Sequence, residues 1–263
     1  MGAVGTPRLL NIGSGPASLT IPAYYEDWDA VRLDIEPRNE PDLLMDAMDL
    51  DTLEASQFDA AYASHLLEHI YPQGLERFMR GVHHVLVADG FVDFRVPDAL
   101  AACRRATEDG TLDAPCYTVA VGTVTAWDML YGYLHYQQVM GPAMAHHNGF
   151  SQQTLTGTLQ AFGFGRVYIA RNEWEMGAIG CKTDLDDDMK ERIGLDRATG
   201  EHRLVHSDDG AANVEPVRQL RPVAELPLRD PSRRSGNGHS PAALAAGGRG
   251  THLPRAAGLG GRL

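Results

Sequence analysis

The chain has 263 residues, of which 43% are hydrophobic, so it is long enough for one or two domains with a packed core. No run approaches roughly 18 consecutive apolar residues, so we expect no membrane span, and three cysteines without metal-ligand spacing suit a cytoplasmic protein. The net charge is −12, and residues 1–189 carry 11 basic and 27 acidic side chains, which makes nucleic acid an unlikely partner.

The first predicted element is a buried strand over residues 8–12, which ends in a glycine-rich turn. Asn11, Gly13, Ser14 and Gly15 lie at its end. Glycines at such a place let the backbone adopt positive φ and pass close to a ligand. An ordinary tight turn explains this segment equally well when it is taken alone.

A second strand is predicted over residues 30–35, with an acidic side chain near its end. Asp34 follows Gly15 by 19 residues. A carboxylate at this place can accept hydrogen bonds from both hydroxyls of a ribose. The turn and the acid together therefore predict a nucleoside-containing ligand, NAD among the candidates.

The third and fourth strands are predicted over residues 42–46 and 58–64, and polar groups follow both. Asp46 could accept a hydrogen bond from an adenine amino group, and the backbone next to it, at Ala47, could donate to a ring nitrogen. Ser64 and His65 lie where a reacting centre would be expected. An acid after the third strand is not explained by a nicotinamide dinucleotide site.

The rest of the folded part continues the alternation. We expect a helix over residues 72–87, a strand over 90–96, a helical lid over 99–150, a helix over 151–162, and paired strands over 166–171 and 174–183. We expect Trp127, Leu130, Tyr131 and Leu134 to face inward in the lid. Strand–helix alternation predicts an α/β fold of the Rossmann-like, doubly wound type: seven strands, mostly parallel, in five βα-type units with a closing antiparallel hairpin.

Four segments of the sequence together resemble a known family. LLNIGSG, RLDIEP, DLLMDAMDLD and FDAAYASHLLEHI occur in the order and spacing of class I S-adenosylmethionine-dependent methyltransferases, and the resemblance runs from about residue 8 to residue 183. It implies S-adenosylmethionine as the methyl donor. Pro16 departs from the pattern, because a third glycine is frequent there.

The resemblance also implies a role for each matching position. Gly13, Ser14 and Gly15 would approach the methionine part of the donor, while Asp34 would hold the ribose and Ile35 would pack on the adenine. Asp46 and Ala47 would contact the adenine edge. Ser64 and His65 would face the sulfonium. The positions implied as donor-binding are therefore Asn11, Gly13, Ser14, Gly15, Asp34, Ile35, Asp46, Ala47, Ser64 and His65.

Two histidines are the candidates for work near the methyl group, namely His65 and His146. A neutral His146, which precedes a helix start, could accept a proton from the acceptor, although a structural bond to a backbone carbonyl explains it equally well. His65 to His69 also match the H-x-x-E-H pattern of zinc proteases. Because that pattern leaves the glycine turn and Asp34 unexplained, we expect no metal site.

The composition changes near residue 190, and residues 191–263 are predicted to be a disordered tail after a domain at 1–190. The predicted function is transfer of a methyl group to a small-molecule acceptor through an O, N or C nucleophile. Two alternatives remain open: a nicotinamide-dependent oxidoreductase, and a methyltransferase-like binding subunit without catalysis. The sequence predicts neither the acceptor nor the oligomeric state.

Overall fold

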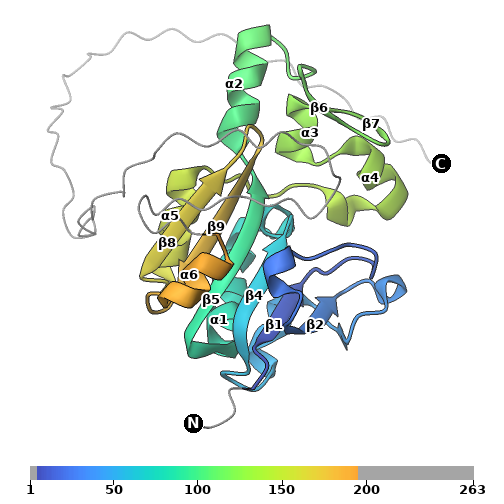
Figure 1. Cartoon of the computed structure of the whole chain (residues 1–263). Coiled ribbons are helices and arrows are strands. Elements are labelled where there is room, and N and C mark those ends of the chain that lie inside the picture. Colours follow the sequence, from blue (N-terminus) through green and yellow to red (C-terminus); the bar gives the residue numbers. More distant parts are fainter. Residues whose placement is uncertain (1–4, 195–263) are drawn as a thin grey trace, which may run out of the picture. The chain divides into compact units, whose positions relative to one another are not determined.

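The computed structural model describes residues 5–194, which form an α/β domain around a seven-stranded sheet (Figure 1). The strand order is β3-β2-β1-β4-β5-β9-β8, and within this sheet only β9 runs against the other strands. The predicted fold, a mostly parallel Rossmann-like sheet with a closing antiparallel hairpin, is confirmed. The strands are β1 Arg8–Ile12, β2 Asp29–Asp34, β3 Leu43–Leu44, β4 Phe58–Ser64, β5 Leu86–Pro97, β8 Arg166–Arg171 and β9 Glu175–Cys181.

The main difference in strand bounds lies at the start of β5. The strand was predicted over 90–96, but Leu86 already pairs with Phe58, and a register shift separates this pair from Ala60 and Phe91. Residues 87–90 therefore form an irregular continuation of the strand, where a separate turn was expected. The helix before it is shorter than the predicted 72–87, because α1 spans Leu75–Val85 and follows the 3-10 turn η5 Pro72–Gly74.

The first three connections of the sheet hold no α-helix. They contain only the 3-10 turns η1 Ala23–Tyr25, η2 Pro37–Asn39 and η3 Ala47–Thr52, so the expectation of five βα-type units is wrong for this part. For the second connection the reason is length and composition. Residues 35–42 read IEPRNEPD, and two prolines among eight residues leave no room for an uninterrupted helical turn. The other two connections, residues 13–28 and 45–57, are longer, but they too contain only 3-10 turns.

Each face of the sheet has its own apolar cluster. On one face, Phe78, Met79 and Val82 of α1 and Leu155 and Leu159 of α5 Gln152–Ala161 are fully buried against the strands. On the other face, a smaller cluster joins Tyr25 and Trp28 to Leu185 and Ile193, with α6 Asp187–Arg192 between the last two. Helix α6 crosses the predicted domain boundary at residue 190. The predicted tail lies, from residue 195 on, outside the described residues.

The predicted lid over 99–150 follows β5 at the carboxyl edge of the sheet (Figure 1). It is less helical than expected, because β6 Pro115–Val119 and β7 Gly122–Thr125 form an antiparallel pair within it. The capping box at Thr125 and Asp128 starts α3. The other lid elements are α2 Ala99–Asp109, α3 Ala126–Tyr131, α4 Leu134–Met140 and the 3-10 turn η6 Pro142–Met144.

The predicted inward stripe of the lid is wrong at two of its four positions, since Trp127 is partly buried and Leu130 packs against a buried cluster that includes Met129. Tyr131 and Leu134 are each half exposed, whereas Ala126 and Met129 are buried. Short helices at α3 and α4 are separated by Gly132, whose φ of 93° breaks the continuous helical face that the spacing assumed. Among residues 5–194, no helix combines the length and the apolar character needed to cross a membrane.

Candidate functional site

The glycine turn, residues 13–15, folds back onto the neighbouring strand β2. The backbone amides of Gly13 and Ser14 both donate to the carbonyl oxygen of Leu33, at 2.8 and 3.0 Å. Gly13 and Gly15 have φ values of 67° and 62°, which only glycine adopts at little cost. A Cβ on Gly13 would lie 3.1 Å from the Cδ1 of Leu66, so the turn also passes close to the segment after β4.

Asp34 ends β2 and is held by backbone groups on both of its oxygens. Its Oδ2 accepts from the amide of Gly15 at 2.7 Å, and its Oδ1 accepts from the amide of Glu36 at 2.8 Å. The residue is 7% exposed. Because each carboxylate oxygen has two lone-pair directions, each oxygen keeps one for a ligand. The predicted glycine turn and the predicted acid are therefore in direct contact, through the hydrogen bond from Gly15 to Asp34.

The other predicted donor-binding residues lie along the same edge of the sheet. Asn11 is buried on β1, opposite Arg32 of β2 and Tyr62 of β4. Ile35 follows β2 directly and exposes 65% of its surface. The remaining predicted residues lie at the ends of β3 and β4. Asp46 and half-buried Ala47 follow β3, and the Oδ1 of Asp46 accepts the amide of Met48 at the start of η3. Half-buried Ser64 ends β4.

His65 lies in the turn after β4 and is bound by two carboxylates. Its Nδ1 lies 3.1 Å from the Oε1 of Glu68, and its Nε2 lies 2.9 Å from the Oε1 of Glu175. Desolvation of the ring nitrogens opposes the charge, but the bonds to Glu175 and Glu68 outweigh it and raise the pKa of His65 to about 10. Both ring nitrogens therefore donate, and His65 has no lone pair for a substrate proton. Its φ is 50°.

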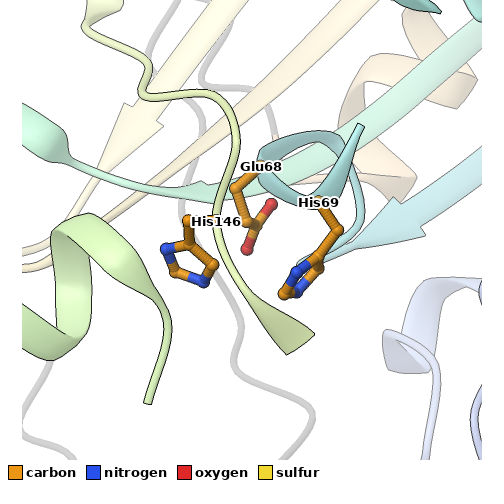
Figure 2. Close-up of side chains that lie close together, drawn as sticks. All are labelled: Glu68, His69 and His146. Carbon is orange, nitrogen blue, oxygen red and sulfur yellow. The ribbon is translucent and has the colours of Figure 1, made fainter. Parts of the chain in front are cut away.

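Glu68 also lies beside two further histidines. One nitrogen each of His69 and His146 and one oxygen of Glu68 all lie within 4.8 Å of one another, and Figure 2 shows the carboxylate with an imidazole on either side. The rings of His69 and His146 meet edge to face at 5.0 Å. Burial lowers the pKa of His146 below its usual value, although the carboxylate of Glu68 acts in the opposite direction.

Backbone hydrogen bonds hold the two segments of this group together. The amides of His147 and Asn148 both donate to the carbonyl oxygen of Glu68, at 2.7 and 3.0 Å. The Nδ2 of Asn148 donates to the carbonyl of Ile70 at 2.8 Å. Residues 65–70 and 145–148, which are far apart in sequence, therefore form one rigid unit. We call His65, Glu68, His69, His146 and Glu175 the histidine cluster.

A buried ion pair lies on β5, next to this cluster. Asp93 and Arg95 are 0% and 2% exposed, and the Nε of Arg95 lies 3.7 Å from the Oδ1 of Asp93. The hydroxyl of Tyr24 donates to Asp93 at 2.6 Å and accepts from Arg95 at 3.0 Å. Tyr24 belongs to the connection that begins with the glycine turn, so this ion pair joins that connection to β5.

The structure brings both predicted catalytic histidines into one cluster, but the sequence prediction missed three of its members. Glu68 and His69 were set aside with the zinc-protease pattern, which requires His65 and His69 on one face of a helix. The structure has a turn and the 3-10 helix η4 Leu67–His69 there, and the two histidines bind different partners. Glu175 stands in no motif, and only the pairing of β9 with β5 brings it to His65.

A family model described as a methyltransferase domain matches residues 4–168 of the chain. The chain belongs to this methyltransferase-domain family. The matched range includes every predicted donor-binding residue and His146, whereas Glu175 lies beyond it. The membership predicted from the four ordered motifs is therefore confirmed, and it disfavours a nicotinamide-dependent oxidoreductase. A comparison with curated proteins finds no match.

Solved structures of methyltransferases also resemble this chain in fold. One is an S-adenosylmethionine-dependent methyltransferase from Archaeoglobus fulgidus, with 15% identity, a TM-score of 0.44, and coverage of 68% of this chain and 87% of the other. Another is the 1,6-didemethyltoxoflavin-N1-methyltransferase of Burkholderia thailandensis, solved with 1,6-didemethyltoxoflavin and S-adenosylhomocysteine. Its identity is 16%, its TM-score is 0.43, and the coverage is 68% and 73%.

Proposed function

We propose that this chain catalyses transfer of a methyl group from S-adenosylmethionine to a small-molecule acceptor. The observation that carries the proposal is the carboxylate of Asp34, held between the amides of Gly15 and Glu36. A buried acid fixed in this way is prepared to accept two ribose hydroxyls, because its orientation is set before a ligand arrives. The exposed side chain of Ile35 beside it offers an apolar surface for the adenine.

The residues of the donor-binding edge fit S-adenosylmethionine, which supplies a methyl group on an electrophilic sulfonium when it is bound. Gly13 and Gly15 leave the backbone open where a larger side chain would crowd Leu66 and Leu19. Asp46 keeps its Oδ2 for an adenine amino group, since only its Oδ1 caps η3. The protein's main work would be to align the acceptor with the methyl group and to exclude water.

His65 and His146 stay the candidates for work near the methyl group, but their bonds suggest different roles. His65 donates through both ring nitrogens, so we infer that it positions Glu68 and Glu175. His146 uses Nδ1 toward the carbonyl of Met129, at 2.9 Å, and so keeps a lone pair on Nε2. That lone pair could take a proton from an acceptor directly.

The acceptor is expected to be a small molecule. Residues 1–189 carry 16 more acidic than basic side chains, so this part of the chain would repel a phosphate backbone. A neutral or cationic acceptor that reacts through oxygen, nitrogen or carbon agrees with this charge. A subunit that binds the donor without transferring the methyl group is the alternative that the experiment below must separate.

The decisive experiment is calorimetric titration of S-adenosylmethionine and S-adenosylhomocysteine into the full chain and into Asp34→Ala. Binding to the wild type should weaken by about 1–3 kcal/mol in the variant, the usual cost of leaving buried polar groups without their partner. Asp42→Ala is the matched control, because Asp42 accepts a backbone amide of the same strand, that of Arg32 at 2.8 Å.

Two results would count against the proposal. No binding to the wild type, or equal losses in Asp34→Ala and Asp42→Ala, would remove Asp34 from the donor site. Donor binding without transfer of a labelled methyl group to any of a set of hydroxyl, amine and activated carbon acceptors would favour the non-catalytic subunit. His146→Ala should then be compared with wild type in single-turnover transfer, where loss of the rate supports its role.

A further inference from the structure

Two imidazoles of the histidine cluster are oriented in the same way by backbone carbonyls. The Nδ1 of His69 donates to the carbonyl of Ala145 at 3.0 Å, and the Nδ1 of His146 donates to the carbonyl of Met129 at 2.9 Å. A carbonyl oxygen can only accept, so each Nδ1 carries a proton, and in the neutral form of each ring the lone pair is on Nε2. A backbone carbonyl behind the imidazole is the usual arrangement behind histidine ligands of metals.

The carboxylate of Glu68 completes this arrangement. Its Oε1 is bound by His65, but its Oε2 is buried and has no hydrogen-bond partner within residues 5–194. The residue is 1% exposed. A buried carboxylate oxygen without a donor or a cation is costly, and native structures rarely leave one so. In the neutral form of these rings, with the proton on Nδ1, neither Nε2 supplies a proton to this oxygen.

We propose that Glu68, His69 and His146 bind a divalent transition-metal ion, with Zn²⁺ as the ion that suits them best. Two imidazole nitrogens and one carboxylate oxygen are a ligand set of metal sites that keep an open position. The three ligand atoms lie within 4.8 Å of one another. Metal–ligand bonds of about 2.0–2.1 Å place ligands roughly 3.4 Å apart, so small side-chain rotations would close the site.

The surroundings of the site agree with a bound ion. Glu68 and His146 line a cavity of about 10 Å³ together with Met129, Asn148 and Phe150. That is space on the order of one water molecule beside two of the three proposed ligands, while His69 does not line it. His65 holds the second oxygen of Glu68 and is itself held by Glu175, so the carboxylate is fixed from behind by groups outside the ligand set.

The proposed site departs from the expectation that the chain has no metal site, and it differs from the zinc-protease interpretation. In that pattern His65 and His69 would share the ion and Glu68 would act as a base. Here His65 lies behind the carboxylate, Glu68 itself is a ligand, and the second imidazole comes from position 146, 77 residues after His69. The inference rests on the proposed function and changes one role in it. With an ion bound, the Nε2 of His146 is a ligand and no longer a base, and an oxygen or nitrogen of the acceptor would take the open position.

Metal binding can be tested without knowing the acceptor. The untagged full chain is freed of metal with a chelator, dialysed against Zn²⁺ and analysed for metal content, and the same protein is titrated with Co²⁺ while its visible absorption is recorded. We expect one equivalent of metal and a Co²⁺ spectrum typical of low coordination. Each of His69→Ala and His146→Ala should weaken binding by more than about 100-fold, since even the loss of an outer-shell partner costs about 10–100-fold.

The controls separate this site from other histidines. His147→Ala removes a neighbouring ring that stacks on Tyr71 and lies outside the ligand set, so it should bind metal as the wild type does. Glu68→Gln keeps the shape of the side chain and should still lose affinity. If an alanine variant fails to fold, judged by circular dichroism, Glu68→Gln and His69→Gln take its place.

Either of two outcomes would overturn the proposal: no retained Zn²⁺ at micromolar concentration, or binding that persists in His69→Ala, His146→Ala and Glu68→Gln. Titration of S-adenosylmethionine into the same variants keeps this test apart from that of the proposed function. His69→Ala should retain donor binding, because Gly15 and Asp34 are unchanged. Metal binding without donor binding would sink the proposed function alone, and the reverse result would sink this inference alone.

Discussion

The two parts of the candidate site are built in different ways. The glycine turn and Asp34 are joined by the amide of Gly15 across 19 residues, within two adjacent strands and the turn between them. The histidine cluster depends on His69 reaching Ala145, 76 residues away, and on His65 reaching Glu175, 110 residues away. The first part can form as soon as β1 and β2 pair, whereas the second requires the lid and β9 to be in place.

The ion pair on β5 connects these two parts. Tyr24, in the connection after the glycine turn, is bound to Asp93 and Arg95, while the carbonyl of Arg95 accepts the amide of His65 at 2.9 Å. Disturbing this ion pair should therefore affect both parts, and disturbing either part should leave the other largely intact. The predictions below test that difference, beginning with the largest effect.

Asp93→Ala should cost the most stability. The substitution removes the carboxylate that neutralises the buried guanidinium of Arg95 and that accepts the hydroxyl of Tyr24. Breaking a buried pair from one side typically costs about 3–5 kcal/mol. Urea unfolding followed by circular dichroism measures the loss, which should exceed that of every other single substitution proposed here.

Tyr24→Phe is the matched control for this effect. It removes one hydroxyl from the same group and keeps the ion pair, so we expect a loss of about 1 kcal/mol. Equal losses in Tyr24→Phe and Asp93→Ala would mean that the buried charge contributes little. The hydrogen bond of Tyr24, and not the ion pair, would then connect residues 13–28 to β5.

The difference between the glycine turn with Asp34 and the histidine cluster also explains how much of the site could be predicted from the sequence. Gly13, Gly15 and Asp34 follow strands whose apolar runs are short and regular, so their place at one edge of a parallel sheet follows from strand order alone. Glu175 could not be found in this way. It lies on a strand with no polar pattern, and only the register in which Pro97 faces Glu175 brings it to His65.

The lid shows a second limit of the sequence. Helical spacing suggested that Tyr131 and Leu134 face inward, but Gly132 ends α3 between them and turns the chain. The connection over residues 35–42 shows the same effect, since Pro37 and Pro41 leave a 3-10 turn in place of a helix. Periodicity identifies which residues are apolar in a segment, but it does not show where one glycine or proline changes the direction of the chain.

His65→Ala should have the second-largest effect and should be confined to the histidine cluster. It removes the donor to the Oε1 atoms of Glu68 and Glu175, both nearly buried. We expect a loss of about 2–3 kcal/mol in the free energy of unfolding, because hydrogen bonds to charged groups count about 1.5–3 kcal/mol and water reaches this half-exposed side chain. Binding of S-adenosylmethionine should change little, since the turn and Asp34 are untouched.

His65→Gly is the control that separates the lost bonds from the backbone. The φ of His65 is 50°, a conformation that glycine adopts freely and alanine does not. The glycine variant should therefore be more stable than the alanine variant by about 1 kcal/mol. An alanine variant as stable as the wild type would contradict the view that two buried carboxylates depend on this imidazole.

The smallest effect is expected at the outer side of the histidine cluster, where the rings of Tyr71 and His147 stack at 3.8 Å. The stack joins the same two segments as the amides that donate to the carbonyl of Glu68, but Tyr71 is 56% exposed. A double-mutant cycle with Tyr71→Ala and His147→Ala should give a coupling of about 0.5–1.5 kcal/mol, the usual range for an aromatic pair. Because four backbone and side-chain hydrogen bonds beneath the stack remain, metal affinity should be unchanged in both single variants.

A coupling near zero would mean that those hydrogen bonds alone hold the two segments together. A metal affinity that falls together with the coupling would show that the cluster depends on its surface as well as on its buried contacts.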